Sequence, residues 1–134
     1  MNTNAHLQFF QNYHNLLLMS DSYKVTHWAM LPPGLGNTES YCESRGGSFP
    51  FTMFFGLQYY MKSYLAGQQV TEEKIQEAKE FYAAHFGNAD YFNEEGWRYI
   101  LEKHNGYLPI GIKAVKEGSI VPIKNVLYKI YSTD

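Results

Sequence analysis

The sequence has 134 residues, of which 45% are hydrophobic and 18% charged, so it can form one folded core and wholesale disorder is excluded. Eleven basic and 13 acidic residues give a formal charge of −2, which leaves no global positive field for nucleic acid or an anionic membrane. The single cysteine, Cys42, excludes an intrachain disulfide and a zinc-finger cluster. No apolar run is long enough for a membrane span and no secretory signal is visible, so we expect a cytoplasmic protein.

The N-terminal part of the chain predicts two helices and a strand. Residues 6–19 are apolar at near-helical spacing, and Ser20 and Asp21 offer N-caps for a short helix over residues 22–30. Two prolines end that helix because neither supplies a backbone donor. Residues 37–45 alternate with period two, which predicts a strand.

The middle of the chain predicts a second short strand and three helices. The strand covers residues 52–55, and Gly56 opens a helix with apolar side chains at i, i+3 and i+4 spacing. Thr71 is expected to cap the next helix, which Gly87 ends. Asn93 is expected to cap the last helix, which Asn105-Gly106 is expected to end.

From Leu108 onward the apolar period changes to two, which predicts a run of strands. Helices, a strand, helices and then strands indicate an α+β fold with short helices on a mostly antiparallel sheet. There is no glycine-rich dinucleotide motif and no Walker loop. We read residues 1–134 as a single domain, and because an apolar strand is followed by no capping element, we expect the polypeptide to continue.

Residues 21–27 form the densest polar cluster of the sequence. On a helix starting at Asp21, His27 is a neighbour of both Tyr23 and Lys24. An exposed helix N-terminus favours anions, and tyrosine offers a flat face to an aromatic ligand. The structural alternative is a capped surface helix with Tyr23 packed in the core.

Arg45 ends the alternating strand, next to two glycines. Its guanidinium fork suits a phosphate or a carboxylate. The alternative is a surface ion pair with Glu43, which would contribute little. The histidine spacing fits no metal motif, and Cys42 is expected to be a buried structural thiol, so we predict no metal ligand and name no catalytic residue.

Several separate blocks of the sequence, in register along nearly the whole chain, resemble the nicotinamide phosphoribosyltransferase family of type II phosphoribosyltransferases. The matching blocks are residues 21–27 with Pro32-Pro33, 40–47, 54–59, 71–78, 92–102, 108–115, 125–127 and 133–134.

This resemblance implies an enzyme that makes nicotinamide mononucleotide from nicotinamide and phosphoribosyl pyrophosphate, a step of NAD salvage. It implies Mg²⁺ and coupled ATP in the full-length enzyme, with neither bound by this part alone. It also implies a homodimer in which the N-terminal domain of one subunit completes the active site of the other.

The resemblance assigns a substrate-binding role to three residues. Tyr23 would stack on the nicotinamide ring, Asp21 would lie near the ring and its amide, and Arg45 would reach the phosphates. Lys24 and His27 match the motif without an assigned contact.

The barrel portion of the family, with its phosphoribosyl-binding loops, lies outside this chain. We therefore expect the chain alone to be inactive. The alternatives are a free-standing binding or dimerisation module derived from this domain, or a relative that uses nicotinate.

Overall fold

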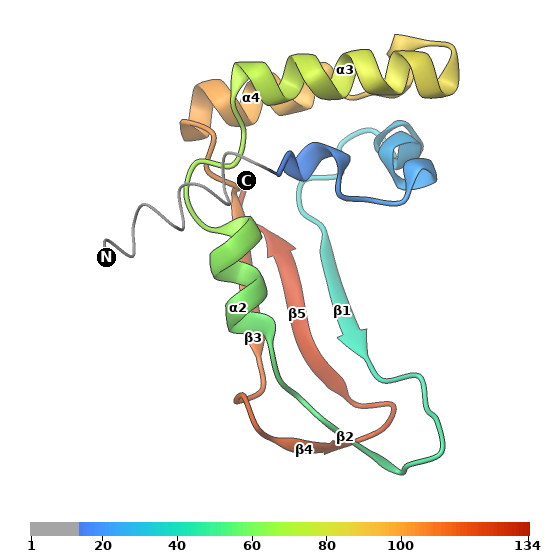
Figure 1. Cartoon of the computed structure of the whole chain (residues 1–134), viewed down its shortest axis with the longest axis vertical. Helices are drawn as coiled ribbons and strands as arrows, with labels where there is room; N and C mark the ends of the chain where they lie inside the picture. The colour runs from blue at the N-terminus through green and yellow to red at the C-terminus, as the bar shows by residue number, and fades with distance from the viewer. Residues whose placement is uncertain (1–13) are drawn as a thin grey trace. The chain divides into compact units, whose positions relative to one another are not determined.

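The computed structural model describes residues 14–134, and these form two compact units (Figure 1). The first unit contains the described residues up to Pro33 together with Met61–Leu108. The second unit contains Gly34–Tyr60 and Pro109–Asp134. That residues 1–134 form a single domain stays a prediction.

The first unit consists of helices. Its elements are the 3₁₀ helices η1 (Leu16–Leu18), η2 (Ser22–Met30) and η4 (Ala89–Tyr91), the π-helical turn η3 (Met61–Leu65), and the α-helices α3 (Glu72–Phe86) and α4 (Glu94–His104). Most of the helix predicted over residues 6–19 lies outside the described residues, and only η1 falls within them. The helix predicted over residues 22–30 has the expected bounds, but it is 3₁₀.

The ends of α3 and α4 confirm the caps predicted from the sequence. The hydroxyl of Thr71 and the side-chain oxygen of Asn93 each accept a hydrogen bond from the backbone N–H three residues later, at 3.4 and 3.0 Å. Gly87 and Asn105 end the two helices in the left-handed conformation, with φ of 73° and 50°. Local chemistry therefore fixes both helices.

The first unit is built around one apolar core. The buried members are Leu17, Val70, Ile75, Ala78, Tyr82 and Phe92. The Tyr82 hydroxyl donates a 3.0 Å hydrogen bond to the carbonyl of Leu17, which ties η1 to α3. The side chain of Asn15 adds a second tie, because it donates to the carbonyl of Lys74 at 2.8 Å.

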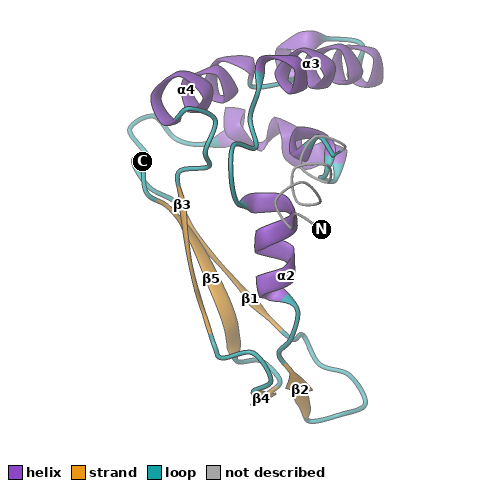
Figure 2. Ribbon diagram, turned by 60° about the vertical axis from the view of Figure 1, so that its left-hand side comes forward, coloured by secondary structure: helices purple, strands orange, loops and turns teal. Residues whose placement is uncertain are grey.

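The second unit contains the strands. They are β1 (Glu39–Glu43), β2 (Phe51–Met53), β3 (Ile110–Ala114), β4 (Ile120–Pro122) and β5 (Val126–Ser132), with the short helix α2 (Leu57–Tyr60). One antiparallel sheet has the order β1-β5-β3, and β2 pairs with β4 in a two-stranded ribbon (Figure 2). These antiparallel sheets, together with the helices, confirm the α+β class.

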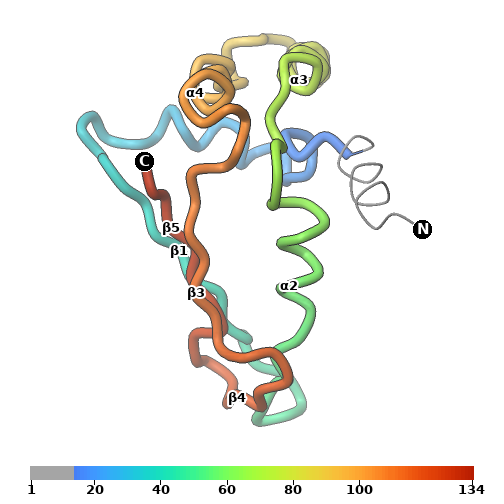
Figure 3. Tube along the Cα trace, turned by 90° about the vertical axis from the view of Figure 1, so that its left-hand side faces the viewer, coloured from blue at the N-terminus to red at the C-terminus, as the bar shows by residue number. Residues whose placement is uncertain are grey.

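The helix predicted to start at Gly56 changes type along its length. It is α-helical over Leu57–Tyr60 and then π-helical, with the N–H of Ala66 bonded to the carbonyl of Met61 at 2.8 Å. At this change of helix type the chain passes from the second unit into the first. The course of the backbone through α2 can be followed in Figure 3. No helix among residues 14–134 combines the length and apolar character needed to cross a membrane.

Candidate functional site

Asp21 occupies the N-cap position of η2 but does not cap it with its side chain. Its backbone is extended, with φ −62° and ψ 131°, and its carboxylate accepts no cap hydrogen bond. The carboxylate instead forms a 3.0 Å ion pair with the Lys24 ammonium. This corrects the expected capping role, because the lysine three residues on competes for the carboxylate. The hydrogen bond to Asp21 raises the pKa of Lys24.

Tyr23 is on the surface, which decides against the alternative that packs it in the core. Its side chain is 60% exposed. The Lys24 ammonium lies over its ring at 5.9 Å from the centroid, and the His27 ring meets it edge-on at 5.4 Å. Asp21, Tyr23, Lys24 and His27 therefore form one cluster around an accessible aromatic ring.

Val25 and Trp28 tie η2 to the other described elements of its unit. None of its residues is buried, and Val25 only packs against the edge of the core. The indole N–H of Trp28 donates a 3.1 Å hydrogen bond to the carbonyl of Tyr91, at the end of η4. Sequence reasoning missed Trp28, because a partner 63 residues away leaves no local signal.

Arg45 follows β1 beyond an irregularity in the pairing of β1 with β5, between Cys42 and Glu43. Its side chain is exposed. Within the described part of the chain, the ion pair with Glu43 that the sequence left open is not formed. On the same strand Glu39 pairs with Lys129 instead, at 2.8 Å.

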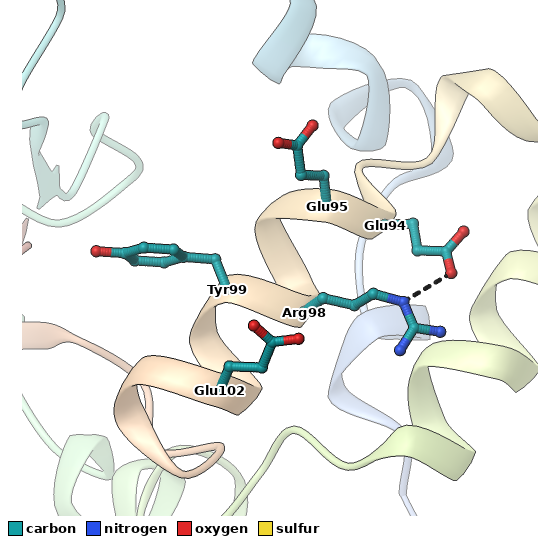
Figure 4. A pocket seen from close by; sticks show the side chains of 5 residues that line it. All are labelled: Glu94, Glu95, Arg98, Tyr99 and Glu102. Atoms are coloured by element: carbon teal, nitrogen blue, oxygen red, sulfur yellow. Dashed lines mark hydrogen bonds and ion pairs between the residues drawn. The ribbon is translucent and has the colours of Figure 1, made fainter.

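The other arginine of the sequence, Arg98, has the opposite environment. Its guanidinium binds Glu72 through two nitrogens, at 2.7 and 2.8 Å, and Glu94 at 2.9 Å. These carboxylates raise the pKa of Arg98. Arg98 also lines a surface hollow on α4, where Figure 4 shows its side chain beside Glu94. The remaining lining residues are Glu95, Tyr99 and Glu102.

This hollow is unsuited to a phosphate. It is lined by three glutamates, and its one guanidinium is already engaged with carboxylates. Arg45, in contrast, forms no ion pair within residues 14–134, so there its guanidinium fork is available for an anion.

Cys42 is the remaining residue that the sequence singled out. Cys42 is half-buried, less enclosed than expected, and lies opposite Tyr128 in the pairing of β1 with β5. Burial raises the pKa of Tyr128, and a hydrogen bond with Cys42 adds to the effect. Between residues 14 and 134 no three His, Cys, Asp or Glu side chains come together as a metal-binding group.

The predicted site residues thus lie in two places. Asp21 and Tyr23 share the cluster on η2 in the first unit, whereas Arg45 belongs to the second unit. That both parts line one pocket stays a prediction.

Comparison with known proteins agrees with the resemblance seen in the motifs. A family model described as "Nicotinamide phosphoribosyltransferase, N-terminal domain" matches residues 15–112, a range that includes Asp21, Tyr23 and Arg45. The nicotinamide phosphoribosyltransferase of Xanthomonas campestris pv. campestris (strain 8004) is 49% identical over 120 residues. These cover 90% of this chain but 25% of the relative, so the chain spans about a quarter of that protein's length.

Proposed function

The chain belongs to the nicotinamide phosphoribosyltransferase family, and from this premise we propose that it is part of an enzyme of NAD salvage. The enzyme transfers the phosphoribosyl group of phosphoribosyl pyrophosphate to nicotinamide, which gives nicotinamide mononucleotide and releases pyrophosphate. The observation that carries this proposal is the 49% identity over 90% of the chain to a protein of that name.

We assign the pyridine end of the site to the cluster on η2. Tyr23 stacks on the nicotinamide ring, and its 60% exposure supports this role because a ligand can reach the aromatic face. Asp21 lies near the carboxamide, where its carboxylate accepts from the amide N–H. The ion pair with Lys24 holds that carboxylate beside Tyr23.

We assign the phosphate end of the site to Arg45. The exposed guanidinium, which no carboxylate neutralises among residues 14–134, supports this role. Its planar fork donates to two phosphate oxygens at once. Tyr23 and Arg45 hold substrate in position, whereas the transition-state electrostatics come from outside this chain.

The complete enzyme is a cytoplasmic homodimer in this proposal, and the N-terminal domain of one subunit completes the active site of the other. The resemblance implies Mg²⁺ and ATP for it. The described residues contain no cluster that fits a metal ion, so we assign Mg²⁺ no ligand here and derive no step through either group.

The test compares two proteins, the 134-residue chain and the complete enzyme that contains it. We expect the enzyme to form nicotinamide mononucleotide from nicotinamide, and the chain alone to form none. Turnover by the chain alone would refute its inactivity. A native reading frame that ends after Asp134 would favour the free-standing module, and a preference for nicotinate would favour the other relative.

Tyr23 offers the sharper test within the complete enzyme. Replacing it with Ala removes the stacking surface, and we expect the KM for nicotinamide to rise by about tenfold. Tyr23→Phe keeps the ring and is expected to stay within about twofold of the parent. Equal KM values in the parent and in Tyr23→Ala would contradict the stacking role.

A further inference from the structure

The loop that carries Arg45 is fastened at both ends to the turn between β4 and β5. The N–H of Lys124 donates to the carbonyl of Ser44 at 2.9 Å, and the N–H of Ile123 donates to the carbonyl of Pro50 at 3.1 Å. Lys124 is therefore bonded to the residue immediately before Arg45. The fold therefore brings the backbone of Lys124 next to the loop of Arg45, although the two residues lie far apart in the sequence.

The backbone of Lys124 is unusual. Among the described residues only Asn105 and Lys124 have a positive φ without being glycine, at 50° and 61°. Asn105 ends α4, and a short amide side chain suits that conformation. Lys124 caps no helix, and a long side chain gains nothing from the left-handed region. Such an outlier is a reason to look for a role of the side chain.

The turn is built to keep this conformation. The Asn125 side-chain amide donates to the carbonyls of Pro122 and Ile123, at 3.3 and 3.2 Å. With the bond from Lys124 to Ser44, these contacts hold the turn against the Arg45 loop. The position of the Lys124 backbone is thus set by the fold.

The surrounding charges leave both cations uncompensated. Arg45 and Lys124 are exposed, and neither forms an ion pair within the region that the structure describes. Two of the glutamates of this unit are engaged elsewhere. Glu39 pairs with Lys129, and Glu117 accepts hydrogen bonds from the backbone N–H groups of Gly56 and Gln58. Glu43 stays exposed, and neither cation pairs with it.

We propose that Lys124 is a further phosphate-binding residue, which adds a second cation to the phosphate end of the site already assigned to Arg45. The guanidinium of Arg45 can make a bidentate contact, and the ammonium of Lys124 adds a compact positive charge. This combination suits a multiply charged phosphate. Two residues after Arg45, a Cβ atom added at Gly47 would meet nothing within 4 Å, so this part of the loop is open to a ligand. The link of this site to phosphoribosyl transfer rests on the proposed function.

The experiment measures binding of inorganic pyrophosphate and of ribose 5-phosphate to the 134-residue chain, by NMR titration at fixed ionic strength. The variants are Arg45→Met, Lys124→Met and Lys124→Gly. Lys116→Met is the matched control, because it removes one exposed lysine from the turn between β3 and β4 of the same unit.

We expect each of the three site variants to weaken pyrophosphate binding by about fivefold or more, and the control to change it by less than about twofold. Lys124→Gly also relieves the left-handed backbone, so its Tm should be no lower than that of the parent. Loss of affinity without loss of stability separates a ligand contact from a structural role. The ligand that binds more tightly identifies which phosphate occupies the site.

Three results would overturn the proposal. One is no binding of either ligand by the parent chain at millimolar concentration. Another is parent-like affinity in both Lys124 variants. The third is an equal loss of affinity in Lys116→Met, which would indicate a general charge effect. Binding is measured independently of turnover. The proposed role of Lys124 can therefore be refuted while the complete enzyme still forms nicotinamide mononucleotide, and phosphate binding can be observed even if the proposed activity is refuted.

Discussion

The two units of this chain differ in how much apolar side chain they bury. The first unit encloses six buried apolar residues, and the interior side chains of α3 contribute half of them. In the second unit, Phe54 is the one buried apolar residue that the structure describes. In this unit, backbone hydrogen bonds join the strands, and β5 pairs with a strand on each side.

This contrast shows two ways of presenting a binding residue. The cluster around Tyr23 lies on a 3₁₀ helix that has no buried residue and that packs beside the apolar core. Arg45 lies instead on a loop whose ends form backbone hydrogen bonds with the turn between β4 and β5. The second unit also leaves apolar side chains exposed on alternate residues in β2 and on either side of it. These are Phe49, Phe51, Met53 and Phe55. The self-association that we expect from such a surface stays a prediction, which light scattering tests.

The strongest disruption should come from Tyr82 in the core of the first unit. Tyr82→Ala removes a buried ring and its hydrogen bond to Leu17, and we expect a loss of about 4 kcal/mol in unfolding free energy. Both tryptophans lie in this unit, so their fluorescence in a urea titration reports its unfolding. The neighbouring Phe81 is 53% exposed, and Phe81→Ala should cost about 0.5 kcal/mol. Similar losses for the two variants would contradict the core assignment.

Phe54 should be the corresponding weak point of the second unit. It is 6% exposed and its ring lies 6.4 Å from that of Tyr128. Phe54→Ala is expected to cost about 3 kcal/mol, read as faster hydrogen exchange of the β5 amides. Phe55 is 80% exposed, so Phe55→Ala serves as the control and should leave that exchange unchanged. Unchanged hydrogen exchange of the β5 amides in Phe54→Ala would show that the pairing of β5 does not depend on the buried ring of Phe54.

A smaller effect is expected at Trp28, which holds η2. Trp28→Phe keeps an aromatic ring but removes the donor to the Tyr91 carbonyl, at a cost of about 1 kcal/mol. Hydrogen exchange should speed up in η2 and stay constant in α3. Thr26→Val is the control, because it removes a hydrogen bond to Tyr23 that stays within η2. A uniform change across both helices would argue against a local tether.

The smallest effect should be the pH dependence due to Glu117. Its carboxylate accepts hydrogen bonds from the backbone N–H groups of Gln58 and Gly56, at 2.9 and 2.7 Å, and these lower the pKa of Glu117 from the usual value of a glutamate. A carboxyl whose pKa is depressed by folding stabilises the fold above its unfolded pKa, and this stabilisation is lost as the pH falls through the folded value.

The urea midpoint of Glu117→Gln should therefore lie below that of the parent at neutral pH, and the gap should close as the pH falls through the lowered pKa of Glu117. Glu95→Gln, on the exposed part of α4, is the control and should show no such gap. A gap that persists in acid would mean that charge on Glu117 is irrelevant.

Local chemistry explains which elements could be predicted from the sequence. The caps at Thr71 and Asn93 and the stops at Gly87 and Asn105 act within a few residues, and each is confirmed. The alternation that predicted β1 is also a local signal. The partners of the strands were not predicted, because pairing depends on contacts between distant segments.

In the candidate site, too, local contacts could be predicted from the sequence and long-range contacts could not. The cluster around Tyr23 depends on neighbours three and four residues apart, so the sequence could place Lys24 and His27 near it. Trp28, Glu117 and Lys124 contact residues that are far away in the sequence. These contacts could not be predicted, because a local sequence pattern carries no information about distant partners.

The pairing of β1 has a consequence for synthesis on the ribosome. Glu39 of β1 and Lys129 of β5 form their ion pair across 90 residues, and β5 is the central strand of its sheet. The nascent chain must therefore carry β1 unpaired while the helical segment is translated, and this sheet closes only when β5 has left the exit tunnel. A premature stop just before that strand would deprive β1 and β3 of a partner at the same moment.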